Sequence, residues 1–205
     1  MRRALIVIDV QNDYFNGTLP IEYPDPAMSL ANIAKSMDAA HKAQVPVVVV
    51  QNIAPAGSPF MATGSQGAEL HPIVKDRPFD LLLVKSLPSC FANTELEAWL
   101  QKRGITCLTV CGYMTHNCVD STIRQAMHLA YKVEFLEDAA GSVSYKNSAG
   151  KANAKEIHEL YKVILQSRFA AVMDTVTWIA GLQGAELPSV DSIYKSNQRA
   201  RGLNP

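Results

Sequence analysis

The 205-residue sequence has no excess of charge of either sign and no long hydrophobic run. Lysine and arginine total 19 residues, and aspartate and glutamate also total 19. This balance gives no electrostatic reason to expect nucleic acid or an anionic membrane as a partner. No apolar run approaches the roughly 20 residues that a membrane-spanning helix needs. The opening MRRALIVIDVQND has two arginines, but Asp9 interrupts its apolar run, so no secretory signal peptide is predicted.

Cysteines are also few, and nucleotide-binding motifs are missing. The four cysteines are unevenly spaced, which is not typical of a disulfide framework in a chain of this length. We therefore expect a reducing, cytoplasmic compartment. The sequence contains neither G-x-G-x-x-G nor G-K-[ST], so it does not support a glycine-rich phosphate-binding loop.

Short, unbroken apolar runs recur along the chain. Such runs, without polar alternation, are typical of parallel strands that are buried on both faces of a sheet. We expect strands at residues 4–9, 45–50, 79–84, 105–110, 132–137 and 169–174.

Helical patterns separate these runs. Asp25 and Pro26 fit the N-cap and first turn of one helix, and Thr94 with Glu97 predicts a capping box for a second that ends at Gly104. A third helix is expected to open at Thr115, and a fourth to span 154–165. Alternating strands and helices predict an α/β fold. We expect one doubly wound domain over residues 1–182, with a mostly parallel six-stranded sheet and helices on both faces (Rossmann-like).

Two regions lack clear periodicity. Residues 51–80 contain PAGSP, TGSQG and DRP, and are expected to form a long loop with at most one short helix. Residues 183–205 are polar and form a C-terminal tail. The tail is interpreted either as a frayed terminus or as an arm that packs on a neighbouring subunit.

Chemistry-bearing residues follow several of the predicted strands. Ligands of open parallel sheets bind beyond the carboxyl ends of the strands. Asp9, Lys85 and Cys118 lie after the first, third and fourth strands, and are expected to converge. Taken singly, the aspartate could cap a turn, the lysine could be solvated and the cysteine could be a small buried hydrophobe.

Together these three residues suit nucleophilic catalysis. A thiol must ionise to attack a carbonyl, and a helix N-terminus and a nearby lysine both favour the thiolate. A neighbouring carboxylate could take the thiol proton and pass it to a leaving amine. The combination therefore supplies a nucleophile, a base and an acid without a histidine.

Three motifs resemble those of the isochorismatase-like cysteine hydrolases. They are IDVQNDYF (8–15), VKSLPSCF (84–91) and GYMTHNCV (112–119), and the resemblance extends roughly from Leu5 to Thr175. It implies an Asp9–Lys85–Cys118 triad that hydrolyses a C–N bond of a small amide or carbamoyl compound through an acyl-cysteine intermediate. It also implies a cis peptide bond at Tyr113–Met114.

The resemblance implies further site residues. The backbone N–H groups of Met114 and Cys118 would form an oxyanion hole. Substrate-binding residues would be Gln11, Phe15, Leu19, Phe91, Tyr113 and His116. For His116, a pocket-lining role and simple solvation are both open, and Phe60 is a weaker candidate for the pocket wall. Family members form dimers and larger assemblies, so a homo-oligomer, dimer or tetramer, is expected.

Departures from the family pattern bear on the substrate. The nicotinamidase branch binds a metal through Asp-x-His after the second strand, whereas this sequence reads QNIAPAG (51–57) there. His71 alone cannot hold a metal, so no metal and no other cofactor is predicted. Isochorismatases proper cleave a vinyl ether and lack the cysteine, so Cys118 favours amide hydrolysis over that alternative. Another alternative is a non-hydrolytic thiol protein that senses oxidants.

The remaining cysteines and histidines have ordinary interpretations. Cys107 and Cys111 are predicted to pack in the core. Cys90 stands where the resembling family usually has alanine, which implies a small filler near the site. His128 and His158 are predicted to be exposed, because polar residues surround them in the sequence.

Overall fold

The computed structural model describes residues 1–204, and its centre is a six-stranded sheet in the order β3-β2-β1-β4-β5-β8. Every neighbouring pair in this sheet is parallel. The predicted α/β fold with a six-stranded parallel sheet is therefore confirmed. The strands are β1 (Arg3–Ile8), β2 (Val47–Asn52), β3 (Leu81–Lys85), β4 (Cys107–Tyr113), β5 (Lys132–Gly141) and β8 (Ala171–Met173).

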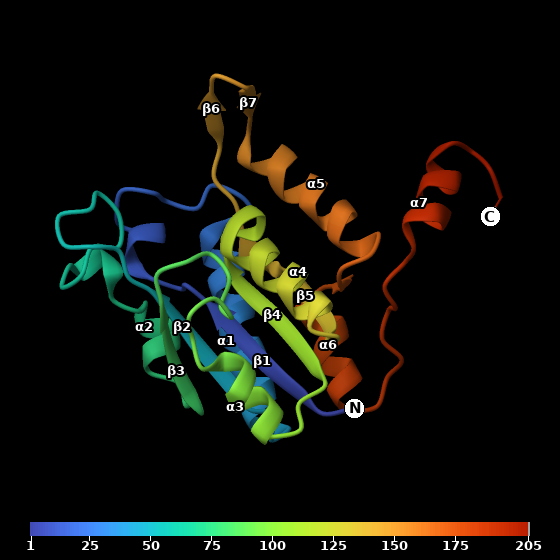
Figure 1. Ribbon diagram of the computed structural model, residues 1–205, viewed down its shortest axis with the longest axis horizontal. Helices are drawn as coiled ribbons and strands as arrows, with labels where there is room; N and C mark the ends of the chain where they lie inside the picture. Colours follow the sequence, from blue (N-terminus) through green and yellow to red (C-terminus); the bar gives the residue numbers. More distant parts are fainter. Residues whose placement is uncertain (205) are drawn as a thin grey trace.

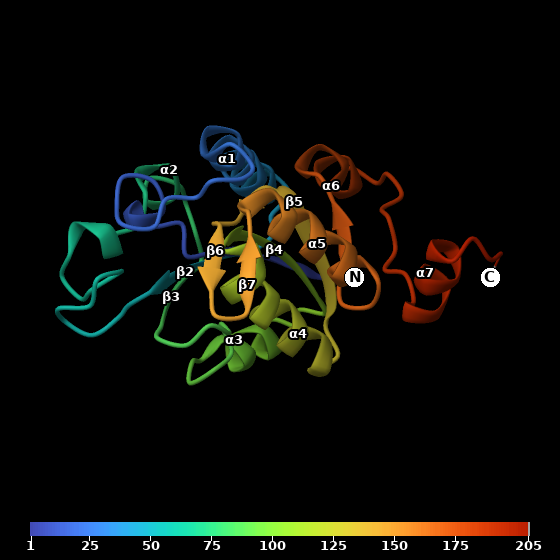
Figure 2. The same ribbon diagram turned by 90° about the horizontal axis from the view of Figure 1, so that it is seen from above.

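Helices cover both faces of the sheet (Figures 1 and 2). On one face lie α1 (Pro26–Lys42), α2 (Pro72–Lys75) and α6 (Thr175–Leu182); on the other lie α3 (Leu96–Lys102), α4 (Asp120–His128) and α5 (Ala154–Gln166). The unbroken apolar runs follow from this arrangement, since alternate residues of one strand enter opposite cores. In β1, Leu5 and Val7 face the first core, and Ala4, Ile6 and Ile8 face the second.

The strand order reverses between β1 and β4. From β1 the chain adds β2 and β3 on one side, whereas β4, β5 and β8 extend the sheet on the other. In open α/β sheets, the crevice beyond the carboxyl ends of the strands at such a switch point is the usual ligand site. Asp9 follows β1, and Cys118 lies five residues after the end of β4.

β5 is longer than predicted and has a bulge. Val110 pairs with Phe135, but Gly112 pairs with Ala140, so two steps along β4 correspond to five along β5. Bulges of this kind re-aim side chains near sites. This one places Gly141 opposite Tyr113 and frees Glu137 and Asp138 from regular pairing.

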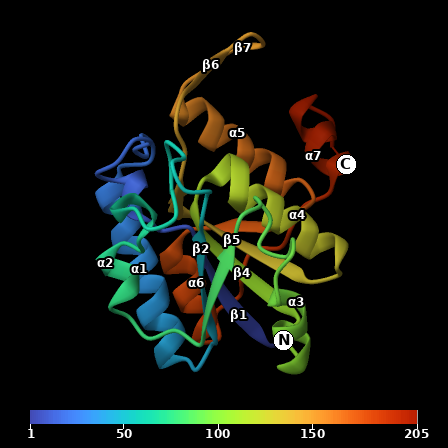
Figure 3. The same cartoon turned by 60° about the vertical axis from the view of Figure 1, so that its left-hand side comes forward.

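Several elements were missed by the sequence patterns. α6 was not predicted, nor was the two-stranded hairpin of β6 (Tyr145–Asn147) and β7 (Gly150–Ala152), which projects from the molecule (Figure 3). The predicted long loop contains a 3-10 turn, Gln66–Ala68, as well as α2.

The helix-start predictions had mixed outcomes. Asp25 does cap α1, accepting a hydrogen bond from the N–H of Ala27 at 2.9 Å. The capping box predicted at Thr94 and Glu97 is wrong, because α3 begins at Leu96 and its N-cap Glu95 makes no side-chain cap. The Thr94 hydroxyl instead donates to the carbonyl of Cys90. A capping box is found at α5, between Asn153 and Glu156.

The tail contains a helix that was not predicted, α7 (Ile193–Ala200), and none of its residues is buried. Before it, the chain is attached to the end of α5 by two hydrogen bonds, from Gln166 to Ser189 and from Asp191 to Gln166. α7 stands clear of the sheet and its covering helices (Figures 1 and 3). Across residues 1–204, no helix combines the length and the apolar character required to traverse a bilayer.

Candidate active site

Asp9, Lys85 and Cys118 meet in one buried cluster, although they come from three separate parts of the chain. Lys85 Nζ lies 2.8 Å from Asp9 Oδ2 and 3.3 Å from Cys118 Sγ. The exposed fractions of the three residues are 1%, 3% and 6%, in that order. The predicted convergence at the carboxyl edge of the sheet is thus what the structure shows.

The local backbone sets the direction of each side chain. Lys85 is the last residue of β3, paired with Asn52 of β2. Asp9 directly follows β1 and has a φ of 52°, a left-handed conformation that aspartate tolerates better than most residues. Cys118 lies in a π-helical turn, Thr115–Val119, that precedes α4, instead of in the first turn of an ordinary α-helix.

Gly112 allows β4 to pass close to β1. Its φ is +105°, and a Cβ at this position would lie 2.1 Å from the carbonyl oxygen of Ile8. Only glycine fits such an approach, because any other residue would collide with backbone that cannot move aside. Gly112 therefore keeps the ends of β1 and β4 adjacent, and with them Asp9 and the Cys118 turn.

The Lys85 ammonium uses all three of its donors inside the cluster. Besides Asp9 and Cys118, it donates to Asn52 Oδ1 at 3.2 Å. Three acceptors match the three N–H bonds of a charged lysine. The second carboxylate oxygen, Asp9 Oδ1, is buried and has no hydrogen-bond partner among the described residues.

Burial dominates the electrostatics of the cluster. It raises the pKa of the Cys118 thiol well above its usual value; the Asp9 carboxylate adds to this and Lys85 opposes it. Burial also raises the pKa of Asp9. For Lys85, burial is the largest single effect and acts to lower the pKa, but the charges of Asp9, Cys118 and Cys90 and the hydrogen bond to Asp9 together raise it. Lys85 favours the thiolate, as expected, but desolvation of the sulfur is the larger effect.

The resting cluster is consequently an ion pair beside a neutral thiol. Moving the thiol proton to Asp9 would leave a lysine cation beside a thiolate, with the same net charge of zero. A buried site tolerates such a transfer because no uncompensated charge is created.

The Tyr113–Met114 peptide bond is cis. The Met114 carbonyl accepts from the N–H groups of Asn117 and Val119, at 3.0 and 3.3 Å. Within residues 1–204, neither the N–H of Met114 nor that of Cys118 donates to a residue outside this turn. Their role as oxyanion-hole donors stays a prediction.

The predicted substrate-binding residues differ in how deeply they are buried. Phe15 and Leu19 are half-buried. Phe91 is 7% exposed and packs in the same core cluster as Cys118. Tyr113 is completely buried, and its hydroxyl is hydrogen-bonded to Ser29 at 2.7 Å. Tyr113 packs edge-on against Phe15 and has no surface open to a ligand.

The structure corrects the prediction that Gln11 binds substrate. Its amide nitrogen donates to the carbonyls of Asn52 and Ala68, and its oxygen accepts from the N–H of Asn52. The side chain is fully buried and its hydrogen-bonding capacity is taken up by backbone. Gln11 therefore anchors the 52–68 loop to the site and does not contact substrate.

His116 is held by two partners. Nδ1 lies 3.0 Å from Ser142 Oγ, and Nε2 lies 2.9 Å from the hydroxyl of Tyr145 on the projecting hairpin. Burial lowers the pKa of His116 to about 4, so its imidazole is neutral at ordinary pH. Both ring nitrogens therefore have partners within the chain, and the pocket-lining role of His116 stays a prediction.

Sequence reasoning missed three polar residues near the cluster. Asn52, which binds Lys85, was visible as a polar residue at a strand end. Tyr14 lies inside the first motif; burial raises its pKa, as would the charges of Asp9 and Cys118 nearby. Tyr145 had no signal, because its place depends on the unpredicted hairpin.

Other predictions were tested by burial. Cys90, Cys107 and Cys111 are fully buried and, like Cys118, form no disulfide within the described chain. His128 is exposed as predicted, but His158 is fully buried, so the prediction for it is wrong. Its neighbours Glu156 and Glu159 lie on the outer side of α5, whereas His158 itself points inward.

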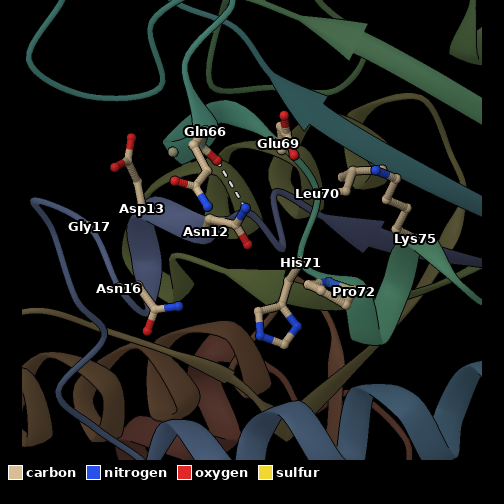
Figure 4. A pocket seen from close by; sticks show the side chains of 11 residues that line it. Asn12, Asp13, Asn16, Gly17, Gln66, Glu69, Leu70, His71, Pro72 and Lys75 are labelled. Atoms are coloured by element: carbon tan, nitrogen blue, oxygen red, sulfur yellow. Dashed lines mark hydrogen bonds between the residues drawn. The ribbon is translucent and has the colours of Figure 1, made fainter.

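A hollow of about 400 Å³ lies beside the first motif, but none of the three clustered side chains lines it (Figure 4). Its wall includes Asn12, Gln66 and His71, with Asn12 donating to the Gln66 carbonyl. His71 Nδ1 accepts from the N–H of Ile73 and so caps α2. Among the described residues, no three His, Cys, Asp or Glu side chains are grouped so as to hold a metal ion.

Comparison with known proteins identifies the family of the chain. The family model described as the isochorismatase domain matches residues 3–176. The chain belongs to the isochorismatase family. A crystal structure of a protein assigned to the isochorismatases, from Burkholderia xenovorans LB400, is 62% identical, with a TM-score of 0.96 over 98% of this chain and 97% of that one.

Two further isochorismatase-family relatives are informative. The family protein YddQ of Bacillus subtilis is 33% identical over 87% of this chain and 99% of its own length. The ureidoacrylate amidohydrolase RutB of Variovorax paradoxus is 32% identical over 66% of this chain and 67% of its own length. The family thus includes amidohydrolases, and this isochorismatase-family chain is a hydrolase.

Proposed function

We propose that the protein is a cysteine hydrolase that cleaves a C–N bond of a small amide or carbamoyl compound. The observation that carries this proposal is the contact of one buried ammonium, Lys85 Nζ, with both Asp9 Oδ2 and Cys118 Sγ. In this arrangement the carboxylate is the base and the thiol is the nucleophile. The buried lysine between them is the cation that neutralises whichever of the two carries the negative charge.

The first step is proton transfer coupled to attack. Asp9 takes the proton of Cys118 as Sγ adds to the substrate carbonyl carbon, and the C=O π pair moves onto oxygen. Burial raises the pKa of Asp9 and so makes it a stronger base than an exposed aspartate. Lys85 stays protonated throughout and stabilises whichever neighbour carries the negative charge.

The second step expels the amine. The tetrahedral oxygen would be bound by the N–H groups of Met114 and Cys118; one such donor typically contributes about 3 kcal/mol to transition-state stabilisation. Asp9 returns its proton to the leaving nitrogen as the C–N bond breaks. Water, deprotonated by Asp9, then hydrolyses the thioester and restores the thiol.

The substrate class rests on two supports. The triad residues are almost completely buried, so the reacting carbonyl must be presented by a small molecule. The related RutB is named for hydrolysis of ureidoacrylate, which fits a carbamoyl or ureido substrate for this chain. No nucleic acid or membrane partner is included in the proposal.

The test is replacement of the nucleophile. In a mass-spectrometric screen of small amides and carbamoyl compounds, we expect wild-type protein to release ammonia or amine and to carry an adduct on Cys118. Cys118→Ala should lose at least about 10³-fold in kcat, whereas Cys107→Ala, at the far end of β4, should retain activity.

Undiminished turnover by Cys118→Ala would refute the proposal. So would a wild-type protein that forms a reversible sulfenate with mild peroxide but no acyl adduct with any amide or ester, since that result indicates a redox-sensing thiol.

A further inference from the structure

One buried histidine has a half-satisfied side chain that the proposed chemistry does not use. His158, on α5, is fully buried, and its Nδ1 lies 2.9 Å from Thr115 Oγ1. Its Nε2 is also buried and has no hydrogen-bond partner among the described residues. A buried unpaired nitrogen is unfavourable, and an apolar side chain of similar size would avoid it. The bond made by Nδ1 is therefore where a role for His158 must lie.

The hydrogen-bond directions around Thr115 are determined by counting protons. The Thr115 hydroxyl donates to the carbonyl of Gly141 at 3.1 Å. A hydroxyl has a single proton, so Thr115 Oγ1 must accept from His158, whose Nδ1 then carries the hydrogen. Nε2 is left as a bare lone pair, 4.0 Å from Glu137 Oε2.

The surroundings keep this histidine neutral. Glu137 is already paired with Lys162 at 2.7 Å, and Lys162 also pairs with Glu159. Tyr23 lies edge-on to the imidazole, and His116 is close enough to act on it electrostatically. Burial, followed by the charge of Lys162, lowers the pKa of His158 to about 4, so the imidazole is neutral above roughly pH 5.

Thr115 is the first residue of the turn that carries Cys118. It lies directly after Met114, whose carbonyl accepts from Asn117 and Val119, and three residues before the thiol. The chain of bonds from His158 through Thr115 to Gly141 thus joins α5, the π-helical turn and the bulged strand β5. Among the described residues, Thr115 is the member of this turn whose side chain is hydrogen-bonded to α5.

We propose that His158 is a positioning residue, which fixes Thr115 and thereby the placement of Cys118 Sγ and the N–H groups of the turn. The proposal rests on the proposed function for its consequence in catalysis. It concerns a residue that touches neither the substrate nor the reacting atoms.

The experiment compares variants that keep or remove one hydrogen bond. His158→Asn keeps a donor near the place of Nδ1, and His158→Leu removes it. Thr115→Ser keeps the hydroxyl, and Thr115→Val removes it at similar volume. His128→Leu, on the exposed side of α4, is the matched control for loss of a histidine.

Three quantities are measured for each variant, well below its melting temperature: kcat and KM for an amide that the wild type turns over, and the rate of Cys118 alkylation by iodoacetamide between pH 6 and 10. His158→Leu and Thr115→Val should each lower kcat at least tenfold, with KM within threefold. Both should also shift the alkylation profile, whereas His158→Asn, Thr115→Ser and His128→Leu should remain within threefold of wild type. The double variant Thr115→Val/His158→Leu should be no worse than the poorer single one.

Additive losses in the double variant, or an equal loss in His158→Asn and His158→Leu, would overturn the proposal. If His158→Leu does not fold, Thr115→Val breaks the same bond without changing α5, and a wild-type rate for it would be equally contrary. If the wild type hydrolyses no amide, the proposed function fails on its own, and the alkylation profiles still decide whether His158 positions the thiol.

Discussion

Replacing Lys85 by methionine should make the stability of the protein depend steeply on pH. The substitution removes the cation from an ion pair with a 2.8 Å separation and side-chain exposures of 0% and 1%. Asp9 Oδ1 already lacks a partner, so the carboxylate of the variant would be buried with little compensation. Loss of one member of a buried pair costs about 3–5 kcal/mol while the other stays charged.

The sign of the pH dependence follows from proton binding. Without Lys85, desolvation raises the pKa of folded Asp9 further above the value of about 3.9 in the unfolded chain. The folded variant therefore binds more protons than the unfolded chain between these two pKa values, and its stability falls as pH rises. The slope is up to about 1.4 kcal/mol per pH unit.

Urea denaturation followed by the fluorescence of buried Trp178 would measure this at pH 5 and pH 8. We expect Lys85→Met to be destabilised by about 3–5 kcal/mol at pH 8, or a melting temperature lower by roughly 6–20 °C, and by much less at pH 5. Asp9→Asn/Lys85→Met should recover most of the loss. Lys162→Met, from a pair with side-chain exposures of 23% and 25%, should cost at most about 1 kcal/mol.

An equal loss for Lys85→Met at the two pH values would refute this reasoning. A double variant no more stable at pH 8 than Lys85→Met would do the same, because both results would show that the buried charge of Asp9 is not the cause.

Three further predictions address other parts of the molecule. Gly112→Ala should destabilise the fold by about 3 kcal/mol or more in the same denaturation assay, because its Cβ would meet the Ile8 carbonyl. The control Gly57→Ala, at a position with φ +81° and open space, should cost about 1 kcal/mol. Equal losses for the two variants would contradict the steric argument. Tyr145→Phe removes the hydroxyl bonded to His116 and should raise KM about two- to tenfold with little change in kcat; an unchanged KM would exclude His116 from the pocket wall. We propose that α7 contacts a second copy of the chain, since Ile193 and Tyr194 are 53% and 66% exposed; sedimentation of the Ile193→Asp/Tyr194→Ser variant should then give a lower mass than wild type, and an equal mass would count against the arm.

Much of the fold and the meeting of Asp9, Lys85 and Cys118 could be predicted because the relevant signals are local. Burial on both faces of a parallel sheet requires unbroken apolar runs, and a switch point gathers whatever polar residues end the strands. Asp9, Lys85 and Cys118 could therefore be selected before the geometry was known.

The sequence predictions failed for residues whose surroundings come from distant parts of the chain. The burial of His158 depends on which face of α5 meets the sheet, and this face cannot be deduced from the flanking glutamates. Gln11 was assigned to substrate because its motif lies at the site, but its amide is taken by backbone of a loop some forty to sixty residues later. The helix position and the lysine favour the Cys118 thiolate, but the size of the opposing desolvation depends on everything packed around the sulfur, which the sequence does not reveal.

The position of Lys85 in the sheet has a consequence for local unfolding. β3 is an edge strand that pairs only with β2, and its Leu82 and Val84 are 42% and 55% exposed. Edge strands with few buried contacts open at lower free energy than the central strands do. When β3 frays, its last residue withdraws from the cluster and the thiol loses its cation. Amide hydrogen exchange should therefore be faster in β3 than in β1 or β4, and hydrolytic activity should disappear on heating before the protein unfolds as a whole.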